Sequence, residues 1–238
     1  MRVAAALAAS LGVGRRSDDV ATLQALARQI GIRGIRQDGV KDFYTRRFCR
    51  MFQGSFMLQG YAVAPLKVDG DPGPKTATAV RLCISNNLKC SEHFSYREFL
   101  TPGSKWVSRR NEVCKTTRRF LMPSERLRAN LSAKHGRDVP VHWVSAYRDP
   151  AYNALLPGAS TTSFHMKGEA GDPNYRLMPT FTEAEARAAG FSGVGVNELD
   201  DTVGHVDPRG WFGRWEYKGR RAVGRIFRRK VPLCAICV

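Results

Sequence analysis

The chain has 238 residues, of which 43% are hydrophobic and 10% aromatic, so it can bury one ordinary core or two small ones. Its formal net charge of +17, from 38 Lys and Arg against 21 Asp and Glu, makes any polyanion a candidate partner, nucleic acid and bacterial cell wall included. No segment approaches the ~20 consecutive apolar residues that cross a bilayer, which excludes a membrane-spanning helix.

The N-terminal residues 1–16 resemble a signal peptide in part, because one basic residue precedes an alanine-rich run. The run is weakly apolar and passes directly into a charged stretch. This pattern favours a helical or frayed N-terminus over a cleaved leader.

An internal repeat follows. "RQDGVKDFYTRRFCRMF" (residues 36–52) aligns with "KVDGDPGPKTATAVRLC" (residues 67–83), and the same offset separates Asp38 from Asp69 and Thr45 from Thr76. Each copy follows a segment whose apolar residues recur at three- and four-residue steps, as in an amphipathic helix. We expect Asp-Gly to form a turn and Thr to cap the next helix.

The second copy resembles the peptidoglycan-binding module whose signature is a helix, a "VDG-x-x-G-x-x-T" turn and an "AV" helix. The first copy departs from that signature at Lys41 and Asp42, where glycine would be expected. The resemblance implies that residues 1–89 bind peptidoglycan, with the first half as a buttress. A generic helical spacer is the alternative.

After Cys90 the pattern changes to short strands with Gly and Pro between them. Residues 122–136 predict an amphipathic helix that ends at Gly136. Alternating residues from Val141 to Ala146 predict a buried strand that leads to Arg148.

In "SFHMKGEAGDP" (residues 163–173), His165 and Asp172 stand seven positions apart. In a helix they would be roughly 10 Å apart along the axis, too far to converge on one atom. Gly168 and Gly171 instead favour a bent, extended turn that brings both side chains to a common point. That point is a candidate metal site.

The ordered segments "SAYRDPAYN", "SFHMKGEAGDP" and "GHVDPRGW" resemble the zinc D-alanyl-D-alanine carboxypeptidase and endopeptidase family of cell-wall enzymes, which shares its fold with the hedgehog signalling domain. The resemblance covers roughly residues 92–217. The central pattern S-x-H-x-x-G-x-A-x-D is complete, with Ser163, His165, Gly168, Ala170 and Asp172. We therefore expect an α+β fold: a small helical bundle, then a domain of this type with a small antiparallel sheet flanked by helices.

One zinc ion held by His165, Asp172 and His205 is the expected cofactor, because hydrolytic zinc commonly takes three such ligands and leaves a fourth position for water. By resemblance and by chemistry, Arg148 is a candidate for binding a substrate carboxylate or a developing oxyanion. Ser163, predicted to share a strand face with His165, has a hydroxyl that either binds substrate or bonds to the backbone.

A catalytic base is harder to assign. Family members commonly place an acid three to six positions before the last zinc histidine, or a second histidine two positions before it. Val203 occupies the latter place, so Asp201 is the favoured base.

Other assignments of the base remain open. In an alternative register Asp207 is the ligand and His205 is the base; otherwise Asp207 orients an imidazole. Asp200 and Glu198 lie just upstream and are further candidates.

The six cysteines have no repeating spacing, so we expect mostly free thiols. The C-terminal pair, Cys234 and Cys237, has the spacing of half a zinc site or of a redox pair, but no second pair matches it. Cys49 and Cys83 fall on apolar helix faces and are expected to be buried.

The sequence thus predicts three parts: a peptidoglycan-binding-like module (1–89), a zinc peptidase domain (90–218) and a basic tail (219–238). Their order resembles a bacteriophage endolysin that degrades peptidoglycan as a monomer. Such an enzyme passes from the host cytoplasm to the wall through a holin; a secreted bacterial enzyme is the other possibility. A non-catalytic zinc-containing wall binder is the alternative function. No nucleic-acid-reading motif accompanies the basic charge.

Overall fold

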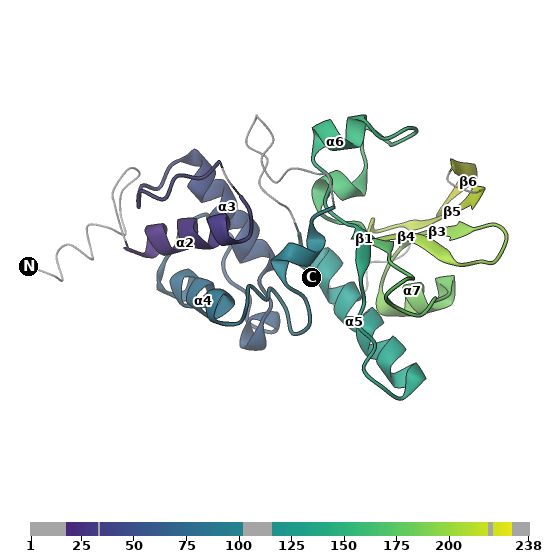
Figure 1. Ribbon diagram of the computed structural model, residues 1–238, viewed down its shortest axis with the longest axis horizontal. Helices are drawn as coiled ribbons and strands as arrows, with labels where there is room; N and C mark the ends of the chain where they lie inside the picture. The colour runs from purple at the N-terminus through teal and green to yellow at the C-terminus, as the bar shows by residue number, and fades with distance from the viewer. Residues whose placement is uncertain (1–17, 33, 102–115, 219–220, 230–238) are drawn as a thin grey trace, which may run out of the picture. The chain divides into compact units, whose positions relative to one another are not determined.

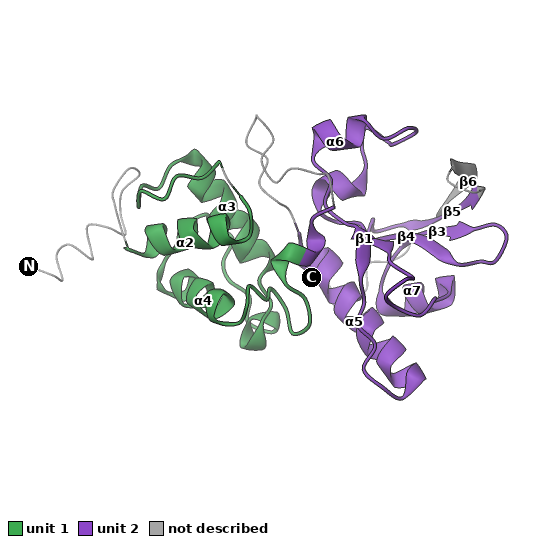
Figure 2. Cartoon of the chain, in the orientation of Figure 1, with its two compact units in different colours: residues 1–97, 105–114 green, residues 98–104, 115–238 purple. Residues whose placement is uncertain are grey.

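The computed structural model describes residues 18–32, 34–101, 116–218 and 221–229 (Figure 1). The N-terminal segment 1–16 and the cysteines at 234 and 237 lie outside this part of the chain. Two compact units are distinguished in Figure 2: residues 1–97 with 105–114, and residues 98–104 with 115–238. Among the described helices, none has the length and apolar character needed to cross a membrane.

Unit 1 is helical. Its elements are α2 (Asp18–Gln29), α3 (Phe43–Ser55), the 3-10 helix η1 (Gln59–Ala62), α4 (Pro74–Ser85) and the start of the 3-10 helix η2 (Tyr96–Phe99). Helix α2 packs against both α3 and α4. Cys49 and Cys83 are buried free thiols, as predicted. Burial raises the pKa of both thiols, that of Cys83 to about 12, so both stay protonated at neutral pH.

A buried glutamine organises the second copy of the repeat. The Oε1 atom of Gln53 accepts from the backbone N–H groups of Asp69 (3.1 Å) and Gly70 (2.8 Å). Its Nε2 donates to Asp69 Oδ1 (2.9 Å), the Asp71 carbonyl (2.9 Å) and Thr76 Oγ1 (3.1 Å). One side chain from α3 thus holds both the Asp-Gly turn and the first turn of α4.

The first copy has the same network, one helix earlier. Gln24 Oε1 accepts from the N–H groups of Asp38 (3.1 Å) and Gly39 (2.8 Å). Gln24 Nε2 donates to Asp38 Oδ1 (3.2 Å), the Val40 carbonyl (3.0 Å) and Thr45 Oγ1 (3.1 Å). The repeat seen in sequence is therefore also a repeat of a buried polar network.

The prediction that Thr45 and Thr76 cap the helices is wrong. The N-caps are Asp42, whose carboxylate accepts from the Thr45 N–H (2.7 Å), and Gly73. Both threonines lie one turn inside and bond to the glutamines. Asp and Gly are both favourable N-cap residues. The helix of the first copy therefore still begins at the same place, although Asp42 stands where the signature has glycine. Lys41, the other departure, is buried and donates to Asp71 (2.7 Å), joining the loops of the two copies.

Unit 2 combines helices with two small sheets, which confirms the α+β prediction. Its helices are α5 (Arg118–His135), α6 (Pro150–Ala154), the 3-10 helix η3 (Phe164–Lys167) and α7 (Glu183–Ala189). Its strands are β1 (Trp143–Ser145), β2 (Asp172–Pro173), β3 (Gly193–Asn197), β4 (Val203–Asp207), β5 (Phe212–Lys218) and β6 (Arg221–Arg229). As predicted, Gly136 ends the long helix, with φ +63°.

The larger sheet has the order β4-β3-β5-β6. It is mixed rather than antiparallel throughout as predicted, since β3 and β5 run parallel while the other pairs are antiparallel. Strand β6 is formed by residues that the sequence analysis placed in the basic tail. Helix α7 packs against β3 and β4 (Figure 1). The smaller sheet pairs β1 with β2.

Two backbone hydrogen bonds connect the sheets. Gly171 N–H donates to the Val206 carbonyl (3.0 Å), and Val206 N–H donates to the Gly171 carbonyl (2.9 Å). This bridge places Asp172, the residue after Gly171, beside β4. The site described below depends on that pairing.

Candidate metal site

His165 lies in η3, and its position is fixed at both ends of that short helix. Ser163 is the N-cap, and its hydroxyl accepts from the His165 N–H (3.3 Å); Gly168 ends the helix with φ +67°. Ser163 is therefore not on a strand face with His165, and its hydroxyl bonds to the backbone, the second of its two predicted roles. The imidazole of His165 is buried, and its Nδ1 atom lies 2.6 Å from the carbonyl oxygen of Ala146.

Asp172 begins β2, directly after a glycine that allows close packing. A Cβ on Gly171 would lie 2.6 Å from Trp143 Cε3 and 2.7 Å from Phe120 Cζ, which real contacts do not allow. The aromatic rings of β1 and α5 thus press against the backbone at this point. Together with the bridge to Val206, they fix the direction in which the Asp172 carboxylate leaves the strand.

His205 is the central residue of β4, and its buried imidazole has a partner on each nitrogen. Nε2 lies 3.0 Å from Asp207 Oδ2, and Nδ1 lies 3.0 Å from Asp172 Oδ1. The ring lies beside that of Trp215, with centroids 5.1 Å apart and the two planes tilted by 54°. The side of His205 that faces Asp172 is therefore Nδ1.

The structure brings the three predicted ligands together. His165 Nε2, Asp172 Oδ1 and His205 Nδ1 lie 3.0 to 3.2 Å from one another. Each histidine has an acceptor at its other nitrogen, the Ala146 carbonyl for His165 and Asp207 for His205. An acceptor there holds the proton, which leaves the inward nitrogen of the neutral ring with its lone pair toward the other ligands. This buried group could hold a metal ion.

The protonation of the group follows from burial and mutual charge. Burial would raise the pKa of Asp172, but the charges and hydrogen bonds of His165 and His205 outweigh it and lower that pKa strongly. Burial also lowers the pKa of His165, against the opposing charge of Asp172. For His205, burial is outweighed by the hydrogen bonds and charges of Asp172 and Asp207, so its pKa is raised. The group is thus a carboxylate beside two imidazoles of different basicity.

Arg148 lies against the group. Its Nη2 donates to Asp172 Oδ2 (2.5 Å), and its Nε donates to Ser145 Oγ (2.8 Å). The Ser145 hydroxyl is in turn 3.1 Å from Thr101 Oγ1. The guanidinium is therefore held in place beside the oxygen of Asp172 that does not face the histidines.

The structure does not bring Asp201 into the group. It lies in the turn between β3 and β4, with φ +53° and a side chain that is 84% exposed, 3.6 Å from Arg214. It stands four positions before His205, and β4 begins only at Val203. At ~3.3 Å per extended residue, four positions span at most roughly 13 Å. The other upstream candidates, Asp200 and Glu198, are exposed in the same turn.

Asp207, the rival ligand, lies on the far side of the His205 ring. It contacts Nε2, whereas Asp172 and His165 lie near Nδ1. Its carboxylate is fully buried and accepts from Arg209 as well. Burial would raise the pKa of Asp207, but the hydrogen bonds from Arg209 and His205 lower it to about 2.

Two aromatic residues near the group were missed in the sequence analysis. Trp215 and Tyr217 alternate on β5, and the register places Trp215 opposite Gly195. A Cβ on Gly195 would lie 2.5 Å from Tyr217 Cε2 and 2.6 Å from Trp215 Nε1, so only glycine admits both rings. The alternation of Trp and Tyr beside the "GVGV" strand was the signal that could have predicted this.

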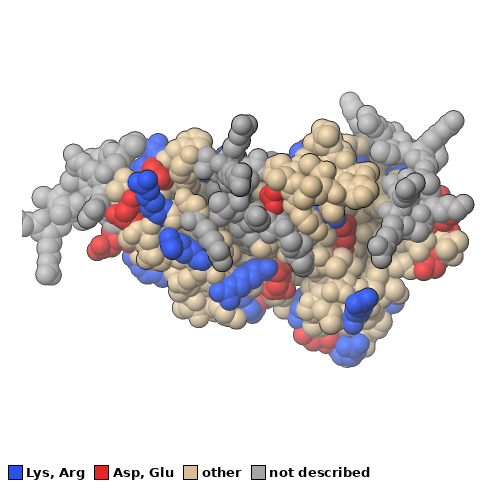
Figure 3. All heavy atoms as spheres, turned by 45° about the horizontal axis from the view of Figure 1, so that its top comes forward, with Lys and Arg blue, Asp and Glu red and all other residues tan. Residues whose placement is uncertain are grey.

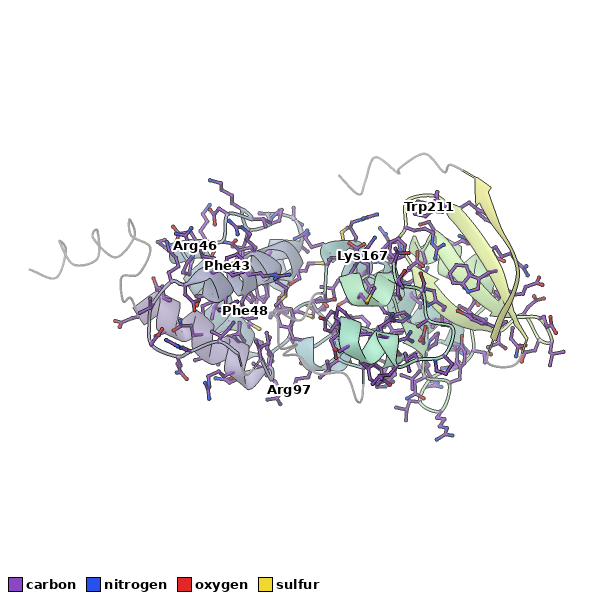
Figure 4. The ribbon with its side chains drawn as sticks, turned by 90° about the horizontal axis from the view of Figure 1, so that it is seen from above. Phe43, Arg46, Phe48, Arg97, Lys167 and Trp211 are labelled. Atoms are coloured by element: carbon purple, nitrogen blue, oxygen red, sulfur yellow. The ribbon has the colours of Figure 1, made fainter. Side chains whose placement is uncertain are left out.

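A second aromatic cluster borders His165 through its chain neighbour Phe164. Lys167 Nζ lies 4.4 Å from the centroid of the Phe164 ring, and the Trp211 ring is 6.2 Å away. Figure 4 labels Lys167 and Trp211 on unit 2. Aromatic side chains therefore lie beside His205, through Trp215, and next to His165 along the chain, through Phe164.

The chain matches no known family model, and it has no significant match among curated proteins. The assignment of a function therefore depends on the motifs of the sequence and on the geometry of the group.

Proposed function

We propose that the chain is a zinc peptidase that hydrolyses a peptide bond in the stem peptide or cross-bridge of bacterial peptidoglycan. The observation that carries this proposal is the convergence of His165 Nε2, Asp172 Oδ1 and His205 Nδ1 within 3.0 to 3.2 Å of one another. His165 and Asp172 come from one of the segments that resemble the cell-wall peptidase family, "SFHMKGEAGDP", and His205 comes from another, "GHVDPRGW".

The donor set fits zinc. Nitrogen and oxygen ligands of a tetrahedral zinc ion lie at about 2.0–2.2 Å from the metal, which places them roughly 3.3–3.6 Å from one another. The observed triangle needs to widen by only a few tenths of an ångström. Two neutral imidazoles and one carboxylate leave a net positive charge at such a centre, as a hydrolytic site requires.

When bound, zinc supplies a Lewis acid and a water molecule of lowered pKa. The protein's own residues orient the ligands and the substrate. Ala146 and Asp207 hold the outer protons of the two histidines. Arg148, fixed between Ser145 and Asp172, offers its remaining N–H groups to a substrate carboxylate or to the oxygen of the peptide under attack.

Unit 1 is proposed to hold the enzyme on the wall. The second copy of its repeat resembles a peptidoglycan-binding module, and Lys and Arg side chains are spread over its described surface (Figure 3). Tethering raises the local concentration of the peptidase at an insoluble substrate. Passage from a host cytoplasm to the wall, or secretion, would each deliver the chain there.

One observation favours the alternative of a non-catalytic wall binder. The predicted base, Asp201, is exposed in a turn and ion-paired with Arg214 rather than placed at the group. If Asp201 is the base, the turn between β3 and β4 must move toward the ligands when substrate binds. Catalytic hydrogen bonds often tighten only in the substrate complex, so this geometry leaves Asp201 as a candidate.

The decisive experiment is a digest of purified peptidoglycan with the full chain, with new termini identified by mass spectrometry. We expect new amino and carboxyl termini at one type of peptide bond. They should disappear with a chelator and return with added zinc. His165→Ala should abolish cleavage and metal binding, whereas His142→Ala, which changes a histidine outside the group, should leave both intact.

A chain that binds the wall and one zinc ion but releases no new termini would support the non-catalytic alternative. Cleavage that persists in a metal-free His165→Ala chain would contradict the metal assignment. The bond that is cut, read from the new termini, would distinguish an endopeptidase from a carboxypeptidase.

A further inference from the structure

A buried ion pair lies behind His205, on the side away from the other ligands. Asp207 is fully buried, and Arg209 donates to both of its oxygens, from Nε to Oδ1 (2.8 Å) and from Nη2 to Oδ2 (2.5 Å). The backbone N–H of Arg209 also donates to Oδ1 (3.1 Å). Asp207 Oδ2 is the same atom that faces His205 Nε2 at 3.0 Å. Arg209, Asp207 and His205 therefore form one continuous chain of contacts.

The sheet is shaped to receive the guanidinium of Arg209. Gly193 and Gly213 are paired in the β3–β5 register. A Cβ on Gly193 would lie 2.3 Å from Asp207 Oδ1 and 2.4 Å from Arg209 Nε, and a Cβ on Gly213 would lie 3.1 Å from Arg209 Cδ. Two strands thus lack a side chain where the ion pair lies.

Aromatic rings enclose the same guanidinium. Its carbon lies 4.5 Å from the centroid of Trp215, 5.3 Å from that of Phe164 and 5.7 Å from that of Trp211. Contacts with three rings and a two-point bond to a carboxylate restrict both the position and the rotation of a planar group. A lysine, whose single ammonium group is not planar, cannot reproduce the two-point bond to the carboxylate or the contacts with the three rings.

We infer that Arg209 is a positioning residue of the metal site: it fixes the Asp207 carboxylate, and that carboxylate fixes the ring of His205 with its proton on Nε2 and Nδ1 free for the metal. The inference deepens the proposed function, since it rests on the same group of ligands. Without the guanidinium, Asp207 loses two hydrogen bonds and can rotate away from His205. The ring then loses the acceptor that selects its tautomer.

The first test reads the tautomer directly in the full, metal-free chain. Ring nitrogen shifts of ¹⁵N-labelled histidine, recorded at a pH where His205 is neutral, distinguish Nε2–H from Nδ1–H. We expect Nε2–H alone in the unchanged protein and a mixture of tautomers in Arg209→Met. The matched control is Arg214→Met, which removes an arginine of β5 that also pairs with carboxylates, those of Glu183, Glu216 and Asp201. It should keep the unchanged pattern.

The second test measures zinc affinity by competition with a chelator. Loss of a residue that orients a ligand typically lowers metal affinity about tenfold to a hundredfold, and we expect this for Arg209→Met. Arg209→Lys keeps a charged donor but not the two-point bond, so its loss should be smaller. Arg214→Met should bind zinc as the unchanged protein does.

A folded Arg209→Met chain with unchanged ring shifts and unchanged zinc affinity would overturn the inference. If that variant does not fold, Arg209→Lys decides: a folded lysine variant with unchanged tautomer and affinity would equally overturn it. Neither readout requires peptide hydrolysis. Failure of the wall digest with both readouts as expected would therefore refute the proposed peptidase activity and leave the role of Arg209 standing.

Discussion

Replacing Gln53 by alanine would test whether the buried polar network of the repeat holds unit 1 together. The side chain makes five contacts of hydrogen-bond length to the Asp69–Gly70 turn and the start of α4. Its two N–H donors and two acceptor lone pairs amount to about four full hydrogen bonds. At a net ~0.5–1.5 kcal/mol each, they amount to about 2–6 kcal/mol, and we expect a loss of about 4 kcal/mol. The groups left behind are partly buried, so water replaces the lost partners incompletely. Gln24→Ala removes the equivalent contacts and should cost about the same.

Hydrogen exchange of the full chain, read by mass spectrometry, would locate the effect. Both variants should raise exchange in α2, α3 and α4 and leave the peptides of unit 2 unchanged. Gln29→Ala is the matched control, because it truncates an exposed glutamine of α2, and such surface changes stay within about 0.5 kcal/mol. If Gln24→Ala and Gln53→Ala destabilise the helices no more than Gln29→Ala, the network does not hold the unit. If only one of the two variants destabilises the helices more than Gln29→Ala, the two copies of the repeat are not equivalent.

Four further predictions concern the site. Zinc affinity should rise with pH through the raised pKa of His205, because metal and proton compete for Nδ1; calorimetry in buffers of different ionisation enthalpy would detect the released proton. In the metal-free chain, protonated His205 should stabilise the fold, fully so below about pH 6.5, the pKa of histidine in the unfolded chain. Denaturant midpoints measured against pH should show this contribution disappearing as pH rises through the raised pKa of His205 in the folded chain. Asp201→Asn should keep zinc and stability within about 0.5 kcal/mol, since its side chain is exposed, while its turnover reports whether the turn reaches the substrate. Asp172→Ala, empty of metal, should still sediment with insoluble peptidoglycan; binding that vanishes at moderate salt would indicate charge attraction alone.

The sequence predicted the parts of the fold that depend on local signals. The end of α5 at Gly136 follows from a residue that adopts positive φ without strain, and the helix faces of the repeat follow from apolar spacing. The capping role given to Thr45 was wrong, because its hydroxyl accepts a hydrogen bond from Gln24, a buried glutamine of the preceding helix α2. Such a partner has no fixed spacing from the motif, so the pattern alone does not reveal it.

Two of the three ligands, His165 and Asp172, were predictable because their spacing and glycines are encoded within one short motif. The bridge between Gly171 and Val206, which brings Asp172 to His205, is a contact between distant segments and left no local signal. Asp201 was proposed as base from its distance along the chain to His205. Asp201 lies in the turn before β4, where its side chain is exposed and faces Arg214, and a spacing along the chain does not reveal that direction.

The three candidate ligands are held in place by contacts of the fold itself rather than by a metal ion. The chain packs closely around the group at three glycines where a Cβ would collide with a ring or an ion pair, namely Gly171, Gly193 and Gly195. Both histidines have their outer nitrogens held by partners that belong to the fold itself, the Ala146 carbonyl and Asp207. We therefore expect the group to form without the metal, unlike small zinc domains that unfold when the metal is removed. If zinc binds as proposed, its binding free energy would hold the ion in one geometry, and a fixed ion with an open fourth position is what the proposed hydrolysis of a peptide bond would require.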